Sequence, residues 1–226
     1  MKILDHGYIR KIESWGGGEA GIAEAGIIEA ARQSTQGAFR GWSHDEKLLA
    51  FLYNNKHATP FEFAGLVIEV QAPLFVFREW HRHRTQSYNE LSARYVPMPD
   101  INYIPSEERI SMNQGANKQA SGIAPLNIGA ANIFREVLRK NYEDAEKIYQ
   151  ESLASGIPKE LARLVIPVGR YSRMRASANL RNWLAFLTLR MDPNAQWEIR
   201  QFALALGLII AEEFPKTWEL FSANKG

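Results

Sequence analysis

The chain has 226 residues, of which 46% are hydrophobic and 23% are charged, the balance of a globular protein with a real core. It contains no cysteine, which excludes disulfides, thiolate metal sites, iron–sulfur clusters and a cysteine nucleophile. The net charge is only +2, but arginines concentrate in residues 78–94 and 163–190, which suggests pockets for small anions more than a nucleic-acid surface.

No stretch suggests a membrane span. The most apolar run, residues 203–211, is about half of the ~20 residues required, and Glu212 and Glu213 close it. Asp5 and His6 lie where a signal peptide would need its apolar core. We therefore expect a cytoplasmic protein with neither membrane nor nucleic acid as a partner.

The first half of the chain mixes strand-like and helix-like patterns. A strand is expected over residues 1–14 and a helix over residues 19–32, followed by a helix that a Ser43–Glu46 capping box opens. The β-rich run 63–72 predicts a strand. Pro73 then fits the first position of a helix over residues 74–84, in which Arg78 and Arg82 share a face.

The second half is mainly helical. A polar loop is expected over residues 105–124, then a long helix over 126–155 that Gly156 and Pro158 stop, and a short helix to Val165. Residues 170–178 predict a strand in which Arg173 and Arg175 share a face, before helices over 180–191 and 196–213. Because no βαβ rhythm is present, we expect an α+β fold with a mixed or antiparallel sheet, in one domain over residues 1–226.

Two familiar motifs do not carry a function here. Gly16, Gly18 and Gly21 satisfy the G-x-G-x-x-G pattern, but the preceding run is too charged for a strand buried on both faces, and a second helix follows the first. A glycine-rich turn is therefore expected, not a Rossmann site. His81 and His83 do not have helical i, i+4 spacing, and no H-E-x-x-H occurs, so no metal site is expected.

The densest group of functional side chains is RHRTQSYNELSARY, residues 82–95. Guanidinium groups match phosphate oxygens, and serine hydroxyls or backbone N–H groups can complete such a cradle. Ser87 and Glu90 also have the spacing of a capping box, which would direct a helix N-terminus at an anion. A solvated basic face and a nucleic-acid patch remain as alternatives at this point.

This segment resembles the signature of the flavin-dependent thymidylate synthases, RHR-x-x-S-x-N-E-x-S-x-R-Y. Further blocks resemble the same family in the same order: HATPFE at residues 57–62, E-x-A-R at 160–163 with Pro167, N-x-R at 179–181, L-R at 189–190 and QWEI at 196–199. The resemblance covers nearly the whole chain.

The resemblance implies a fold specific to this family, FAD as cofactor, and methylation of dUMP at C5 with 5,10-methylenetetrahydrofolate and NADPH as co-substrates. That chemistry needs no enzyme thiolate, in agreement with the missing cysteine. The protein then contributes orientation and electrostatics. The resemblance also implies a homotetramer with shared active sites.

Site residues carry over from the family motifs. Arg190 is the residue expected beside the uracil, where a fixed cation would stabilise negative charge as N3 loses its proton; the alternative is an arginine interacting with a helix C-terminus. The dUMP site is expected to comprise Glu79, Arg82, Glu90, Leu91, Ser92, Ala93, Arg94, Arg163 and Arg190. The FAD site is expected to comprise Ser34, Thr59, Arg82, His83, Arg84, Asn89, Glu90, Asn179, Arg181 and Ala185.

Three positions depart from the family pattern. Glu79 stands where many members have a nucleotide-contacting glutamine; since a carboxylate repels phosphate, we expect it to pair with a nearby arginine. Ala185 replaces a polar residue that often contacts flavin, and Phe63 replaces a histidine. Other functions remain open: methylation of UMP, hydroxymethylation of dUMP, or a non-catalytic RNA-binding module.

Overall fold

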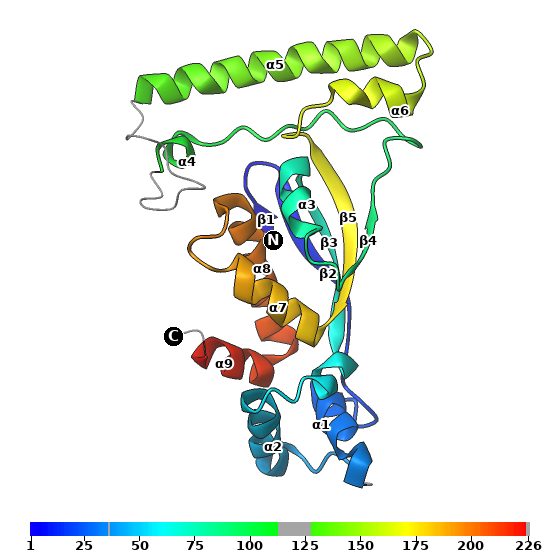
Figure 1. Ribbon diagram of the computed structural model, residues 1–226, viewed down its shortest axis with the longest axis vertical. Coiled ribbons are helices and arrows are strands. Elements are labelled where there is room, and N and C mark those ends of the chain that lie inside the picture. Colours follow the sequence, from blue (N-terminus) through cyan, green and yellow to red (C-terminus); the bar gives the residue numbers. More distant parts are fainter. Residues whose placement is uncertain (36, 113–127, 225–226) are drawn as a thin grey trace.

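The computed structural model describes residues 1–35, 37–112 and 128–224, which form one antiparallel sheet flanked by helices (Figure 1). The five strands lie in the order β1-β2-β3-β5-β4 and every neighbouring pair is antiparallel, so the expected α+β class is confirmed. The strands are β1 (Lys2–Ile3), β2 (Gly7–Trp15), β3 (Gly65–Pro73), β4 (Ser87–Glu90) and β5 (Tyr171–Asn179). The α-helices are α1 (Ala25–Arg32), α2 (Trp42–Asn54), α3 (Leu74–Trp80), α4 (Glu107–Ser111), α5 (Ile128–Ala154), α6 (Lys159–Ala162), α7 (Leu180–Arg190), α8 (Trp197–Glu213) and α9 (Pro215–Ala223). Short 3-10 turns are η1 (Gln33–Thr35), η2 (Thr59–Phe63) and η3 (Arg163–Val165).

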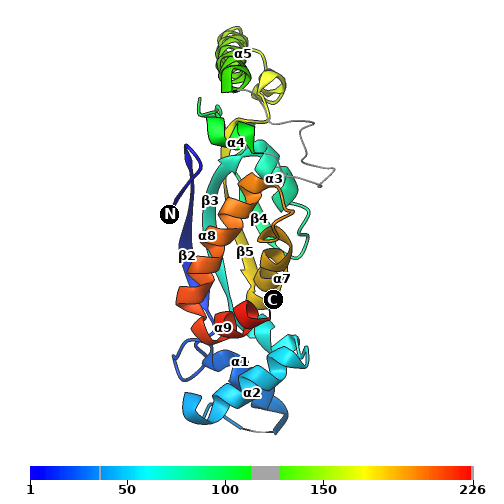
Figure 2. The ribbon, with the colours of Figure 1, turned by 90° about the vertical axis from the view of Figure 1, so that its left-hand side faces the viewer.

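The hydrophobic core lies on one face of the sheet. The β3 side chains on this face, Leu66, Ile68, Val70 and Ala72, are fully buried, because the strand alternates its side chains between the two faces. Helices α3 and α7 pack against β3, and α8 packs against β2; in Figure 2 α7 and α8 lie in front of the sheet. Trp183 on α7 donates from Nε1 to the Leu66 carbonyl at 3.0 Å. The core thus holds α3 and α7, the two helices that carry candidate site residues, against the sheet.

The opposite face of the sheet is polar. Glu69 on β3 accepts a hydrogen bond from the Tyr8 hydroxyl at 2.8 Å and pairs with Arg10 at 2.9 Å. Burial opposes ionisation of Glu69, but its bonds to Tyr8 and Arg10 and the nearby Arg173 outweigh it and lower the pKa. Arg173 and Arg175 alternate along β5 and are both exposed, as the sequence pattern predicts.

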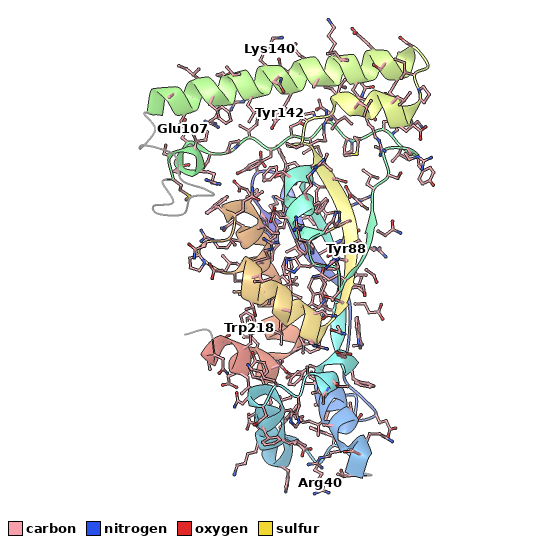
Figure 3. The ribbon with its side chains drawn as sticks, in the orientation of Figure 1. Arg40, Tyr88, Glu107, Lys140, Tyr142 and Trp218 are labelled. Carbon is pink, nitrogen blue, oxygen red and sulfur yellow. The ribbon has the colours of Figure 1, made fainter. Side chains whose placement is uncertain are left out.

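Helix α5 lies across one end of the sheet (Figure 1). The Tyr142 hydroxyl donates to the Tyr103 carbonyl at 3.2 Å, and Arg170 pairs with Glu146 at 2.5 Å. Figure 3 shows Tyr142 on the side of α5 that faces the rest of the chain and Lys140 on the other side. The helix therefore buries one face and leaves the other exposed.

The N-terminal expectations need correction. Residues 1–14 form a hairpin of two strands, and the helix expected from residue 19 begins at Ala25. Gly16 has φ +128°, and a Cβ there would lie 2.5 Å from Ala64 Cβ, so the glycine-rich run is a tight turn. The Ser43 capping box is wrong: Gly41 precedes α2, and the Ser43 hydroxyl contacts the His44 ring.

The helix expected over residues 74–84 ends at Trp80, and Pro73 is its N-cap residue. The Tyr88 hydroxyl donates to the His83 carbonyl at 2.7 Å and also contacts the Trp80 carbonyl, which turns the chain back toward the sheet. Arg82 therefore does not share a helical face with Arg78. The capping box expected at residues 87–90 is also wrong, because these residues form β4 and pair with β5.

Other boundaries differ less. Helix α4 lies within the expected polar loop, whose residues 113–124 fall outside the described ranges, as does Leu126, the expected start of α5. Helix α9, which starts at Pro215, was not expected. Within the described residues, no helix combines the length and apolar character needed to cross a membrane.

Candidate functional site

A cavity of about 570 Å³ lies between α3, the segment after β4 and the η3 turn. It brings together five of the residues expected at the dUMP site, which come from two segments far apart in the sequence. These are Glu90, Leu91, Ser92, Ala93 and Arg163. The first four are consecutive, so it is Arg163 that the fold brings to them.

Local backbone contacts fix the first of these segments. The Leu91 N–H donates to the Arg173 carbonyl at 2.8 Å, which ties the end of β4 to β5. A turn follows, closed by a hydrogen bond from the Tyr95 N–H to the Ser92 carbonyl at 3.0 Å. Ala93 is buried in a small apolar cluster that includes Tyr149 on α5. Ser92 is thus held at the rim of the cavity by its neighbours.

Two basic side chains that were not assigned to the site from the sequence also line this cavity. Arg78 lies on α3 and His81 directly follows that helix, so both come from the turn of chain before the RHR motif. The His81 ring stacks on Phe77 at 6.1 Å and meets the Tyr88 ring edge-on at 4.8 Å. The i, i+3 spacing of Arg78 and His81 could have indicated that the two side chains lie on the same side of the helix.

Three arginines of the signature lie elsewhere. Arg82, Arg84 and Arg94 are exposed and do not line this cavity. The Nε atom of Arg94 lies 3.1 Å from a carboxylate oxygen of Glu160, and both side chains are more than half exposed. Within one chain, the structure therefore does not bring these guanidinium groups to Ser92 and Arg163.

Arg190, at the end of α7, forms a separate cluster with two residues from the α3 region. Its Nη1 donates to a Glu79 carboxylate oxygen at 3.0 Å, and its Nη2 donates to the Glu79 carbonyl at 3.0 Å. Its Nε donates to His83 Nε2 at 2.8 Å. The arginine expected to pair with Glu79 is therefore Arg190, and this expectation is confirmed.

The acceptor role fixes the state of His83. An Nε2 that accepts a hydrogen bond from a guanidinium carries no proton, so the ring is neutral. Burial, and then the charge of Arg190, lower the pKa of His83 from 6.5 to about 4, although Glu79 opposes the shift. The ring also packs edge-on against Phe186 at 4.7 Å. The neutral ring of His83 thus accepts a hydrogen bond from Arg190 and helps to hold it in place.

The residues expected at the FAD site fall into separate groups. A second cavity, of about 300 Å³, is lined by Arg181 and Ala185, together with Tyr53, Lys56 and Phe61. Asn89 and Glu90 line a third cavity, of about 320 Å³, with Arg173 and Arg175.

Four other FAD candidates do not line the second cavity. Thr59 opens η2 and is exposed, and so is Arg84. Ser34 is exposed on η1, where its hydroxyl donates to the Ala31 carbonyl at 3.2 Å. The Asn179 side chain accepts from the Asn182 N–H at 3.0 Å and caps α7.

The second cavity combines aromatic and basic side chains. Aromatic rings of Tyr53 and Phe61 offer a surface for a flat ring system, and Lys56 and Arg181 offer charge for phosphates. Arg181 pairs with Glu62 on η2, and more than half of the Arg181 side chain is exposed. Ala185 presents no polar atom here, as its departure from the family pattern implies.

Comparison with known proteins places these features in a family context. Residues 19–216 match the model of a family described as thymidylate synthase complementing protein. The flavin-dependent thymidylate synthase of Thermosipho melanesiensis is 34% identical over 221 residues, which cover 98% of this chain and 93% of that protein. The enzyme of the same name from Thermus thermophilus is 36% identical over 224 residues, covering 99% and 78%. The solved structure of the UMP/dUMP methylase PolB from Streptomyces cacaoi, bound with 5-Br UMP, has a TM-score of 0.83 at 30% identity and covers 98% of this chain and 96% of that one.

Proposed function

Since the chain belongs to the family described as thymidylate synthase complementing protein, we propose that it is a flavin-dependent thymidylate synthase. It methylates dUMP at C5 and uses FAD, 5,10-methylenetetrahydrofolate and NADPH. The observation that carries this proposal is the cavity of about 570 Å³, which Ser92 and its neighbours line together with Arg163. A nucleoside monophosphate matches such a cavity in size and charge.

The phosphate is bound at the cationic side of this cavity. Arg163, Arg78 and His81 supply positive charge or N–H donors, and Ser92 supplies a hydroxyl. Charge-assisted hydrogen bonds of this kind are about twice as strong as neutral ones. The glutamate at position 90 lies at the same cavity, where its carboxylate can accept hydrogen bonds from the sugar or the base.

Arg190 does not line the large cavity of its own chain, so it activates the base of a nucleotide whose site it completes from a neighbouring copy. A guanidinium is a fixed cation that can stabilise negative charge on the uracil ring when N3 loses its proton to water. The chain has no cysteine, so a thiolate cannot add to C6 of the ring. Activation therefore rests on electrostatics, and the position of Arg190 matters more than its acidity.

Arg181 of the second cavity, and Asn89 and Glu90 of the third, would hold FAD. When bound, FAD supplies the redox chemistry that reduces the transferred one-carbon unit to a methyl group. The side chains of Tyr53 and Phe61 exclude water from one side of the cofactor site.

The working unit is a homotetramer in which copies of the chain complete one another's sites. Ile133 and Val137 on α5 and Leu208 on α8 are 67%, 61% and 63% exposed, which is unusual for large apolar side chains unless a partner covers them. Arg82 and Arg94, which lie outside the cavity of their own chain, are available to a neighbouring copy.

A second candidate substrate is UMP. PolB from Streptomyces cacaoi is a UMP/dUMP methylase, and this chain is 30% identical to it in sequence. Discrimination between the two nucleotides depends on whether the pocket admits a 2′-hydroxyl, so both substrates must be compared directly.

The test is tritium release from dUMP labelled at C5. Release that requires both FAD and methylenetetrahydrofolate, with dTMP as product, is the expected result. Arg190→Ala should lower turnover about 10²–10³-fold, as the loss of a charge-stabilising group does. Arg139→Ala, which removes a surface arginine on α5, should leave turnover unchanged. Release from UMP alone would identify the second candidate, and no release from either nucleotide would refute the proposal.

A further inference from the structure

The guanidinium of Arg190 is held on three of its sides. An arginine side chain has five N–H donors. Among the described residues, one donor each from Nε, Nη1 and Nη2 is engaged, by His83, by the Glu79 carboxylate and by the Glu79 carbonyl. One hydrogen on each Nη atom is left for a ligand. The side chain is only 17% exposed, so this arrangement is enclosed by protein.

Glu79 contributes charge as well as geometry. Its carboxylate oxygen lies 3.0 Å from Nη1 of Arg190, while 45% of the Glu79 side chain remains exposed. His83, on the other side, is neutral and adds no charge. The net charge that the cluster presents to a ligand is therefore set by one carboxylate and one guanidinium.

We propose that Glu79 is a positioning residue that also sets the effective charge of Arg190. It orients the guanidinium through its side chain and its carbonyl, and it offsets part of the positive charge that would stabilise an anionic pyrimidine. This inference rests on the proposed function, in which Arg190 stabilises the N3-deprotonated ring. A glutamine at position 79 would keep the hydrogen bond to Nη1 and remove the negative charge.

The consequence is a selective change in affinity. A carboxylate a few ångströms beyond the guanidinium repels an anionic ring more than a neutral one. Glu79→Gln should therefore favour the anionic ligand about tenfold, the effect of two charges interacting across a partly solvated site. Loss of a purely structural contact would weaken both ligands alike.

The experiment measures binding of dUMP and of 5-fluoro-dUMP to the FAD-loaded protein at one mildly alkaline pH. Fluorine makes N3 more acidic, so much of the analogue but little of dUMP is ionised under these conditions. The readout is the ratio of the two dissociation constants. It is measured for the wild type, Glu79→Gln, Arg190→Ala and the double variant. Glu136→Gln, which removes a carboxylate from a surface pair with Arg139, is the matched control.

The expected result is a ratio shifted about tenfold toward 5-fluoro-dUMP in Glu79→Gln and no shift in Glu136→Gln. Arg190→Ala should shift the ratio the opposite way, and the double variant should combine the two shifts, because each charge acts on the ring directly. An unchanged ratio in Glu79→Gln, or the same shift in Glu136→Gln, overturns the role of Glu79. If the wild type binds neither nucleotide and does not turn over dUMP, the proposed function fails instead. The two failures are therefore distinguishable.

Discussion

The buried Arg170 gives a sharp test of how the fold supports the cavity. Arg170 is fully buried, and its guanidinium donates to the Pro99 carbonyl at 2.9 Å and to Glu146 of α5 at 2.5 Å. Asp100 lies 3.2 Å away but is more than half exposed, so its contribution is small. Arg170→Met leaves the Glu146 carboxylate without its partner in a site where its side chain is only 15% exposed. Removal of one member of such a pair costs about 3–5 kcal/mol.

The double variant Arg170→Met with Glu146→Leu separates the charge from the geometry. It removes both members of the buried pair and leaves the Pro99 carbonyl and the exposed Asp100 without Arg170, so the loss of unfolding free energy should fall to about 1–3 kcal/mol. Urea unfolding followed by tryptophan fluorescence, at one fixed protein concentration, measures both values. Lys140→Met, in an exposed pair on the same helix, should match the wild type. A single variant as stable as the wild type, or a double variant no better than the single one, would refute the reasoning.

Three further changes test individual side chains. Arg78→Ala should weaken dUMP binding at least about tenfold, since a hydrogen bond to a charged group is worth about 1.5–3 kcal/mol, whereas Arg40→Ala, on a distant exposed arginine, should not. Ser92→Ala should cost less, about 1 kcal/mol of binding free energy, because a neutral hydroxyl is lost. The fold lowers the pKa of His83 from 6.5 to about 4. As the pH drops from about 6.5 to about 4, the His83 ring is protonated in the unfolded chain before it is protonated in the folded one, so the free energy of unfolding should fall. His83→Gln should reduce this fall in denaturation measured at two pH values, and an identical slope would contradict the assignment.

The sequence predicts most of the regular elements because their patterns are local. The buried alternation of β3 and the long amphipathic α5 appear close to their expected positions. Boundaries failed where a contact from a distant segment decides the outcome. Helix α3 stops at Trp80, where the Tyr88 hydroxyl reaches its carbonyl, and residues 87–90 pair with β5 although their spacing fits a helix cap.

The candidate site divides in the same way. The motif at residues 90–93 and the distant Arg163 meet at one cavity, as the family resemblance implies. The contribution of Arg78 was not assigned, because it depends on where α3 ends and on which side of that helix the cavity lies. The partner of Glu79 could be expected only as an arginine, since several lie nearby in the sequence and α7 is over 100 residues away.

The strand at residues 87–90 explains why residues of one motif line different cavities. Strand geometry sends successive side chains to opposite faces of the sheet. Tyr88 pairs in register with Ala176 on the buried face, whereas Asn89 pairs with the exposed Arg175 on the polar face. Glu90 borders both the large cavity and the third one. A helix in this segment would have placed side chains three and four apart on one face and separated Asn89 from Arg175. Because a strand forms, consecutive residues of a short motif can face different ligands. Pairing with β5, a strand distant in the sequence, fixes which residue faces which side.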